Sequence, residues 1–212
     1  TTNVLAWMNK KRKPCFRFLG NNFMYEVEAK NKNGKLLIIF GPPAVGKTSV
    51  GKVLESRSNF KLFHNHMVMD SIMHLFGVGT LSEDKLSRII RENVIKEAAE
   101  AGMNLIFTYV WNFAKEKGKT NIDFYKNIYE STGGEVIFIE LVAPLSVRAE
   151  RANNPMRNVE KKYAPNRDRV LALEDSLNFT SPNPFFYSNY TKIDTENKTL
   201  EAIAEIILSI IR

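Results

Sequence analysis

The chain has 212 residues, of which 44% are hydrophobic and 25% charged, and this composition suits one globular domain with a sizeable core. No apolar run is long enough for a membrane helix, and the first residues lack the order of a signal peptide. Cys15, the only cysteine, cannot form an internal disulfide, so we expect a cytoplasmic protein without a membrane partner.

Most of the net charge of +7 lies in the first part of the chain. Residues 1–35 hold eight Lys or Arg and two Glu, a balance of +6, whereas the other 177 residues hold 22 basic and 21 acidic ones, a balance of +1. We therefore treat residues 1–34 as a basic leader, in which the weak alternation of Phe23–Ala29 predicts an edge strand or a hairpin. The body has no charge excess for nucleic acid, so nucleic-acid binding is left open only for the leader, at Lys10–Lys13.

The strongest motif follows the apolar run Leu36–Phe40, which is typical of a parallel strand covered on both faces. Residues 41–48 match the phosphate-binding P-loop G-x-x-x-x-G-K-S/T, and a helix is expected over Lys47–Ser56. In such a loop the glycines let backbone N–H groups surround phosphate oxygens, the lysine reaches the β/γ-phosphates, and the Thr48 hydroxyl can hold Mg²⁺. The expected nucleotide contacts are Gly41, Pro42, Pro43, Ala44, Val45, Gly46, Lys47, Thr48 and Ser49.

Strand and helix patterns then alternate, which predicts an α/β fold with a three-layer, doubly wound parallel sheet of five core strands. The expected strands after the first are Phe60–His64, Asn104–Val110, Glu135–Val142 and Tyr190–Asp194. The expected helices are Met67–Phe76, one capped by Ser82 and ending near Ala101, Ile122–Ser131, Leu145–Ala152, Arg167–Leu177, and a last one capped by Asn197 whose Leu200, Ile203, Ile206, Ile207 and Ile210 face the sheet. A polar lid is expected at about 153–167.

Ligands bind such sheets at the carboxyl ends of the strands, and several arginines follow the fourth strand. Arg148 and Arg151 are three residues apart and so share a helix face, and Arg157 lies in the lid. Phosphoryl transfer depends on positioning and on charge stabilisation, which arginines on a closing segment can supply. The alternative is a set of ordinary surface arginines paired with Glu150 and Glu160.

Together the P-loop on the first core strand, the arginine-rich lid and the Asp194-Thr195 ending of the fifth strand resemble the P-loop small-molecule kinases. These are the nucleoside monophosphate, shikimate and chloramphenicol kinases and their relatives, and the resemblance covers about residues 35–212. It implies a P-loop NTPase fold with the strand order 2-3-1-4-5 and a lid that closes over ATP. It also implies that Arg148 stacks on adenine, that Arg151 and Arg157 contact phosphates, and that the backbone near Thr195 lines the base pocket.

The chain departs from that family after its second strand, where many relatives carry an aspartate and this chain has His64-Asn65-His66. His66 could serve as the general base, since an unperturbed histidine pKa of ~6.5 suits proton transfer near neutrality. Asp70, one helical turn on, is its rival, and a purely structural histidine is the third possibility. The expected acceptor-binding residues are His64, Asn65, His66, Asp70 and Trp111, and packing in the core is the alternative for Trp111.

A metal site is a weaker interpretation of the same region. His66, Asp70 and His74 share a helix face, but the first and last are ~12 Å apart along the axis, too far for one ion. His64 with Asp70 or His66 stays open as a zinc site. At the end of the fourth strand, Glu140 is either a P-loop ATPase acid or a strand residue.

The sequence therefore predicts an enzyme, monomeric or homodimeric, that transfers the γ-phosphoryl group of ATP to a hydroxyl or phosphate of a small-molecule acceptor. ATP and Mg²⁺ are the expected cofactors, because the Asp-x-x-Gly and Asn-Lys-x-Asp motifs of GTPases are absent. Lys47, Arg151, Arg157 and His66 are the expected catalytic residues. The alternative is a P-loop ATPase or nucleotide-binding switch that has no small-molecule acceptor.

Overall fold

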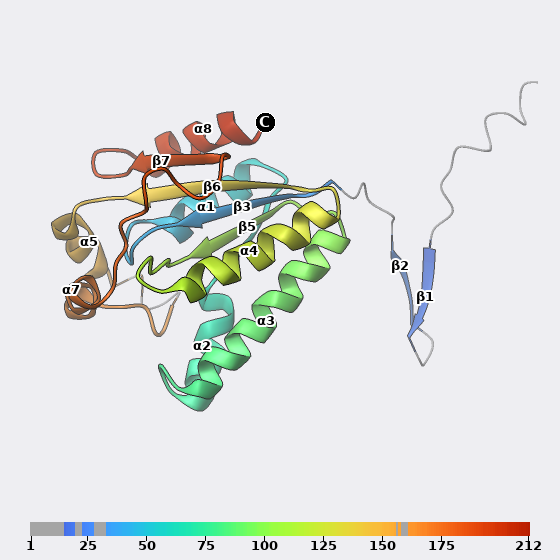
Figure 1. Cartoon of the computed structure of the whole chain (residues 1–212), viewed down its shortest axis with the longest axis horizontal. Coiled ribbons are helices and arrows are strands. Elements are labelled where there is room, and N and C mark those ends of the chain that lie inside the picture. The colour runs from blue at the N-terminus through green and yellow to red at the C-terminus, as the bar shows by residue number, and fades with distance from the viewer. Residues whose placement is uncertain (1–14, 20–22, 28–32, 156, 158–160) are drawn as a thin grey trace, which may run out of the picture.

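The computed structural model describes residues 15–19, 23–27, 33–155, 157 and 161–212. Its core is a parallel sheet in the order β4-β5-β3-β6-β7. The strands are β3 (Lys35–Phe40), β4 (Lys61–His64), β5 (Leu105–Tyr109), β6 (Glu135–Val142) and β7 (Tyr190–Asp194). Numbered along the chain from β3, this is 2-3-1-4-5, so the predicted fold class and strand order are confirmed (Figure 1).

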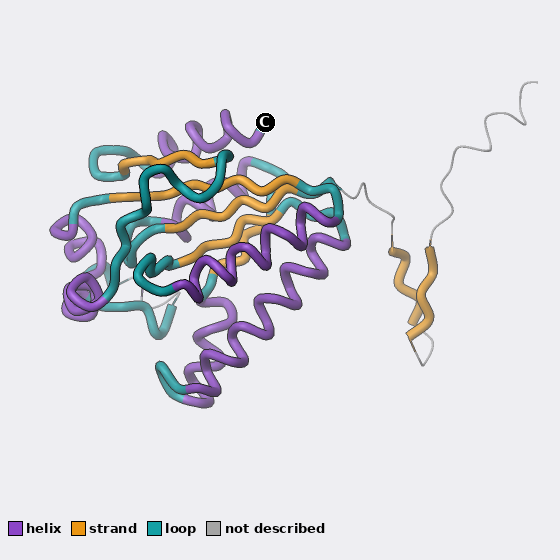
Figure 2. Tube along the Cα trace, in the orientation of Figure 1, coloured by secondary structure: helices purple, strands orange, loops and turns teal. Residues whose placement is uncertain are grey.

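Helices cover both faces of the sheet, which gives the three predicted layers (Figures 1 and 2). On one face α1 (Lys47–Arg57) and α8 (Leu200–Ile211) pack on alternate residues of β3 and β6. On the other face lie α3 (Leu81–Glu100) and α4 (Glu116–Ser131). Because both faces are covered, every residue from Leu36 to Phe40 is buried, which explains the unbroken apolar run in the sequence.

The remaining helices gather around the carboxyl ends of the strands. α2 (His66–Phe76) follows β4 directly and pairs with α3, whereas α5 (Leu145–Ala152) follows β6 and packs against α7 (Arg167–Ser176) (Figure 1). The P-loop leaves β3 between these two groups. The fold therefore brings the helix after the second core strand and the helices after the fourth to one edge of the sheet.

Three local predictions were wrong. α3 is capped by Thr80 rather than Ser82, since the Thr80 hydroxyl accepts a hydrogen bond from the Glu83 N–H at 3.2 Å. α8 is capped by Thr199 rather than Asn197 for the same reason, with the Ala202 N–H as donor. α4 begins at Glu116, six residues before the predicted start at Ile122. A capping hydroxyl thus defines the start of α3 and of α8, whereas α4 follows Lys115, whose side chain makes no capping hydrogen bond.

The sheet-facing stripe of α8 was predicted only in part. Ile203 and Ile207 are buried, but Leu200, Ile206 and Ile210 are each more than a third exposed. The face that packs on the sheet is completed instead by Ala204, Leu208 and Ile211. The helix is apolar on more than one side, so spacing alone did not identify which side is buried.

The leader contributes β1 (Cys15–Leu19) and β2 (Phe23–Val27), which form an antiparallel pair. This pair is a separate two-stranded sheet, so the alternative of an edge strand on the core sheet is not observed. The basic run Lys10–Lys13 lies outside the described residues. Among the described residues, no helix has the length and apolar character needed to cross a membrane.

Candidate active site

The backbone of the P-loop takes conformations that explain its two glycines. Gly41 has φ 142° and Gly46 has φ 106°, both in the region that favours glycine. A Cβ atom on Gly41 would lie 2.2 Å from the carbonyl oxygen of Leu141, so the loop leaves the sheet in close contact with β6. A Cβ atom on Gly46 would meet nothing within 4 Å. The space beside Gly46 is therefore open at the start of α1, where backbone N–H groups can bind an anion.

Lys47 lies inside this loop, where its ammonium group donates hydrogen bonds to the carbonyl oxygens of Gly41 at 2.9 Å and Pro42 at 2.7 Å. Burial lowers its pKa well below the ordinary value, and the charges of Lys161, Arg157 and Arg148 lower it further. Among the residues that the structure describes, every named charge that acts on the Lys47 pKa is positive. A site that gathers this many cations around a buried lysine fits a polyphosphate, whose negative charge would offset their mutual repulsion.

The predicted Mg²⁺ contact also fits the geometry. Thr48, the first threonine of α1, is buried beside the loop. Across the described part of the chain, no three His, Cys, Asp or Glu side chains come together as a metal cluster. A Mg²⁺ ion at Thr48 would therefore take its other oxygens from phosphates and water, as Mg²⁺ does in nucleotide sites.

Arg148 does not occupy the position that the family resemblance implied. Its guanidinium is 3% exposed, donates from Nε to the Ala143 carbonyl at 3.1 Å, and pairs through Nη2 with Glu174 of α7 at 2.9 Å. Its Nη1 is buried without a hydrogen-bond partner. A buried, ion-paired group cannot stack on an exposed base, so the predicted adenine stack is wrong here, although the Arg148 charge reaches Lys47.

Arg151 also differs from its predicted place on the phosphates. It donates to the hydroxyl of Thr195 at 2.9 Å and to the Thr195 carbonyl at 2.7 Å. The Thr195 hydroxyl lies 3.3 Å from the carbonyl oxygen of Val45, in the P-loop. Arg151 therefore fixes the segment after β7 against the P-loop. Both terminal nitrogens of its guanidinium are used in these contacts, and Nη2 also lies 3.5 Å from the carbonyl oxygen of Glu196.

Arg157, in the lid, lies closer to its prediction. Its Nη1 donates to the Pro165 carbonyl at 3.0 Å, which braces the two ends of the lid segment. Burial lowers its pKa, and its charge reaches Lys47. Its guanidinium is therefore within electrostatic range of the P-loop lysine, and its contact with phosphates stays a prediction.

On the acceptor side, the two rival bases form one unit. His66 Nδ1 lies 2.8 Å from Asp70 Oδ1, and both side chains are about one fifth exposed. An ionised carboxylate can only accept, so Nδ1 carries the proton and Nε2 keeps its lone pair. Burial lowers the pKa of His66, while the bond to Asp70 opposes this and the charges of Lys161 and Lys47 add to it. His66 is thus neutral near pH 7 and within electrostatic range of the P-loop lysine.

The neighbouring histidine is held neutral more strongly. Burial, followed by the charge of Lys161, lowers the pKa of His64 to about 4. Its Nδ1 is buried and has no hydrogen-bond partner. His64 therefore contributes a neutral ring beside the site.

Asn65 lies between the two histidines, in the position that joins β4 to α2. Its N–H donates to the Thr108 hydroxyl of β5 at 3.2 Å, and its side-chain oxygen accepts from Arg91 at 2.6 Å. The sequence interpretation missed Arg91. The spacing along α3 was the available signal: Arg91 lies four residues from Ser87 and from Ile95, so it shares their helix face, and both of these residues are fully buried.

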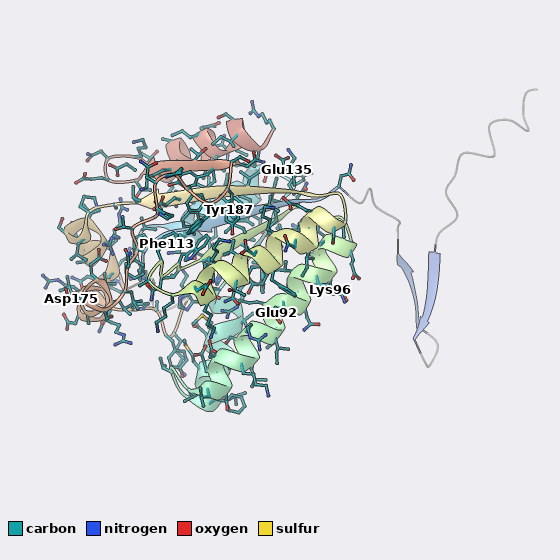
Figure 3. All side chains as sticks on the ribbon, in the orientation of Figure 1. Glu92, Lys96, Phe113, Glu135, Asp175 and Tyr187 are labelled. Carbon is teal, nitrogen blue, oxygen red and sulfur yellow. The ribbon has the colours of Figure 1, made fainter. Side chains whose placement is uncertain are left out.

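Trp111 does not form an open wall for the acceptor. It is 1% exposed, stacks on Phe113 with ring centroids 4.9 Å apart and meets Phe40 edge-on at 5.4 Å. Phe113 and Tyr187, which belong to the same aromatic cluster, lie over the sheet in Figure 3. The acceptor contact predicted for Trp111 is therefore replaced by core packing.

Glu140 is a strand residue that binds its neighbours on one side of β6. Its carboxylate is almost fully buried and accepts hydrogen bonds from Ser181 and Tyr190, with Lys192 at 3.3 Å. These contacts direct it toward β7. It therefore lacks the position beside Thr48 that a P-loop ATPase acid would need.

Comparisons with known proteins agree with this fold. No family model and no curated protein matches the sequence. Among solved structures, a sugar kinase from Janibacter sp. HTCC2649 aligns with TM-score 0.57 and 16% identity over 84% of this chain and 94% of its own. The tunicamycin resistance protein of Deinococcus radiodurans aligns with TM-score 0.55 and 20% identity over 84% and 96%. Shikimate kinase from Acinetobacter baumannii, in complex with shikimate, gives TM-score 0.54 and 17% identity over 85% and 94%.

The sheet order, the P-loop and these neighbours define the class of fold. The chain has the fold of the P-loop small-molecule kinases over nearly the whole of its core domain.

Proposed function

We infer that the protein is an ATP-dependent phosphotransferase that moves the γ-phosphoryl group to a hydroxyl or phosphate of a small molecule. The observation that carries this proposal is the His66–Asp70 pair, a neutral base within electrostatic range of the buried P-loop lysine. A nucleotide site alone would need no such base. The neighbouring folds support it, since they include a sugar kinase and a shikimate kinase.

Each group has a role in this reaction. The acceptor hydroxyl loses its proton to His66 Nε2 as its oxygen forms a bond to the γ-phosphorus. The bond from that phosphorus to the β–γ bridging oxygen breaks, and ADP leaves with the electron pair. Lys47 and Arg157 stabilise the charge on the transferred group, and Thr48 would hold the Mg²⁺ that neutralises the phosphates. Arg148 and Arg151 hold the surrounding segments in place.

The alternative, an ATPase or switch without an acceptor, has less support. Such a protein would be expected to place an acid beside Thr48, and the one candidate, Glu140, is engaged with β7.

The test is a coupled assay of ADP release with ATP and Mg²⁺ over sugars, sugar acids, shikimate-like acids, nucleosides, nucleotides and antibiotics. We expect one class of acceptor to stimulate release, and Lys47→Ala to abolish it, with Lys96→Ala on the surface of α3 as the control. Steady release that no acceptor stimulates would favour the ATPase. Full activity of Lys47→Ala would refute the assignment of the P-loop.

A further inference from the structure

Arg91 is a buried cation that the proposed reaction does not use. It lies in the middle of α3, is 8% exposed, and donates from Nη1 to the neutral side-chain oxygen of Asn65 at 2.6 Å, while its guanidinium also lies beside the neutral hydroxyl of Tyr125. Its Nε is buried without a partner. Buried arginines are normally paired with a carboxylate, because an unpaired charge away from water is unfavourable.

The described surroundings of Arg91 contain no carboxylate that pairs with it. Glu83, two turns earlier on the same buried face of α3, is hydrogen-bonded to Ser87 at 3.1 Å. Glu92, the next residue along the chain (labelled in Figure 3), pairs with Arg88 at 3.0 Å. Burial raises the pKa of the nearby Tyr125 to about 12, so its phenol stays neutral even though the Arg91 charge opposes this rise. The positive charge of Arg91 therefore stays unbalanced.

Arg91 lies at the end of the site where we place the acceptor. Asn65 directly follows β4, binds Thr108 of β5 and also orients Arg91, so the guanidinium lies at the carboxyl ends of two neighbouring strands. His66, the proposed base, is the next residue after Asn65. A ligand group held by Arg91 would thus belong to the same small molecule whose hydroxyl faces His66.

The charges around this region favour an anion as well. Lys161 and Lys52 lower the pKa of His64, and Lys161 and Lys47 lower that of His66. The Asp70 carboxylate, which is bound to His66, acts on both pKa values in the opposite direction. A neutral acceptor would leave the buried Nε donor of Arg91 without a counterpart.

We propose that Arg91, oriented by Asn65, forms an anion subsite, and that the acceptor carries an oxyanion group, a carboxylate or a phosphate, besides the hydroxyl that is phosphorylated. This proposal rests on the proposed phosphotransferase function. An arginine offers a planar fork that matches either oxyanion with two hydrogen bonds. The subsite would therefore select charged acceptors against neutral ones of the same shape.

The first experiment compares paired acceptors in the ADP-release assay: gluconate with glucitol, shikimate with methyl shikimate, and AMP with adenosine. We expect only charged members to stimulate release. Arg91→Gln should raise the KM of the active acid about 100-fold, equivalent to about 2.8 kcal/mol since each tenfold change is 1.4 kcal/mol, with the KM of ATP within twofold. Arg91→Lys should lie between, and Arg88→Gln, an exposed arginine one turn away, should behave as wild type.

The second experiment needs no turnover and keeps the proposal testable if no acceptor is found. Protein saturated with Mg²⁺ and a non-hydrolysable ATP analogue, which fills the P-loop, is titrated with sodium sulfate at constant ionic strength by calorimetry. We expect saturable binding in wild type and Arg88→Gln, and its loss in Arg91→Gln. If Arg91→Gln does not fold, as judged by circular dichroism, Asn65→Ala should weaken sulfate binding while the fold is kept.

Two outcomes would overturn the subsite: sulfate binding that is equal in wild type and Arg91→Gln, or a neutral acceptor preferred over its charged partner with no effect of the substitution. Failure of the proposed function looks different. In that case no acceptor stimulates ADP release, while the sulfate titration still decides whether Arg91 binds an oxyanion.

Discussion

The two P-loop glycines should fail in different ways when each gains a methyl group. Both Gly41 and Gly46 have positive φ, so alanine at either position is strained by roughly 1–3 kcal/mol. At Gly41 the new Cβ atom would also lie 2.2 Å from the Leu141 carbonyl oxygen, whereas ordinary carbon–oxygen contacts lie at ~3.3–3.6 Å. Moving β6 or the loop apart by about 1 Å adds an overpacking cost of roughly 1–3 kcal/mol.

These costs translate into melting temperatures. A domain of this size loses ~2–4 °C per kcal/mol. With the middle of each range, about 2 kcal/mol for Gly46→Ala and about 4 kcal/mol for Gly41→Ala, Tm should fall by about 4–8 °C and about 8–16 °C. Gly79→Ala is the matched control, because Gly79 also has positive φ and open space within 4 Å but lies in the turn between α2 and α3. It should cost as much stability as Gly46→Ala.

Nucleotide binding should distinguish Gly46→Ala from Gly79→Ala, which are expected to have the same stability without ligand. In thermal unfolding with and without a non-hydrolysable ATP analogue and Mg²⁺, wild type and Gly79→Ala should be stabilised by the ligand, because it binds only the folded state. Gly46→Ala should lose most of that stabilisation, since its methyl group fills the open space in the loop. Equal Tm values for all three variants would refute the close approach of the loop to β6. Normal nucleotide stabilisation of Gly46→Ala would refute the open space as the phosphate cradle.

Three further predictions concern the histidines and Arg151. Asp70→Asn removes the group that raises the pKa of His66, so the acid limb of the pH profile of kcat/KM should move to lower pH. The plateau of that profile should also fall, by up to the roughly 10²–10⁴-fold that a positioned base contributes. An unchanged profile would exclude the His66–Asp70 pair as the base. Since the pKa of His64 falls from 6.5 to about 4 on folding, the unfolded state binds more protons between these values. Stability should drop as pH falls through that window, by about 1–2 kcal/mol after allowance for partial exposure, and urea unfolding of His64→Gln should lack this slope. Arg151→Lys should lose the two hydrogen bonds to Thr195 and destabilise the fold by roughly 1–3 kcal/mol. The Thr195 amide should then exchange its hydrogen faster than in wild type. Protection of that amide equal to wild type would contradict the bracing role of Arg151.

The features that could be predicted from the sequence are those that depend on residues close together in the chain. The run Leu36–Phe40 is apolar at every position because both faces of β3 are covered, and the motif behind it has a fixed spacing. The shared helix face of His66 and Asp70 belongs here too, since residues four apart on a helix are neighbours, although the sequence was interpreted as offering two rival bases and not a pair. The family resemblance added the strand order, which local patterns do not contain.

The features that could not be predicted depend on contacts between distant segments. Arg148 was assigned to adenine because its helix precedes the lid, but its partner, Glu174, lies on a later helix that only the folded chain brings near. Trp111 follows a strand end, where ligands bind, yet two of the aromatic residues that enclose it, Phe40 and Phe185, come from distant parts of the chain. A linear pattern shows that a side chain is polar or apolar. It does not show which side chain it will meet.

The contact between Thr195 and Val45 has a consequence for the order in which the protein acquires its structure. The two residues are 150 positions apart, and the hydroxyl of one lies against the carbonyl of the other. At the ~5–20 residues per second of translation, β3 and the phosphate loop would leave the ribosome roughly 8–30 s before the segment that braces them. For the earlier part of that interval, until β6 emerges, the apolar residues Leu36–Phe40 of β3 also lack that neighbouring strand. The nascent chain thus carries an unbraced phosphate loop for most of its synthesis, and the loop gains its contact with Thr195 only after β7 has emerged.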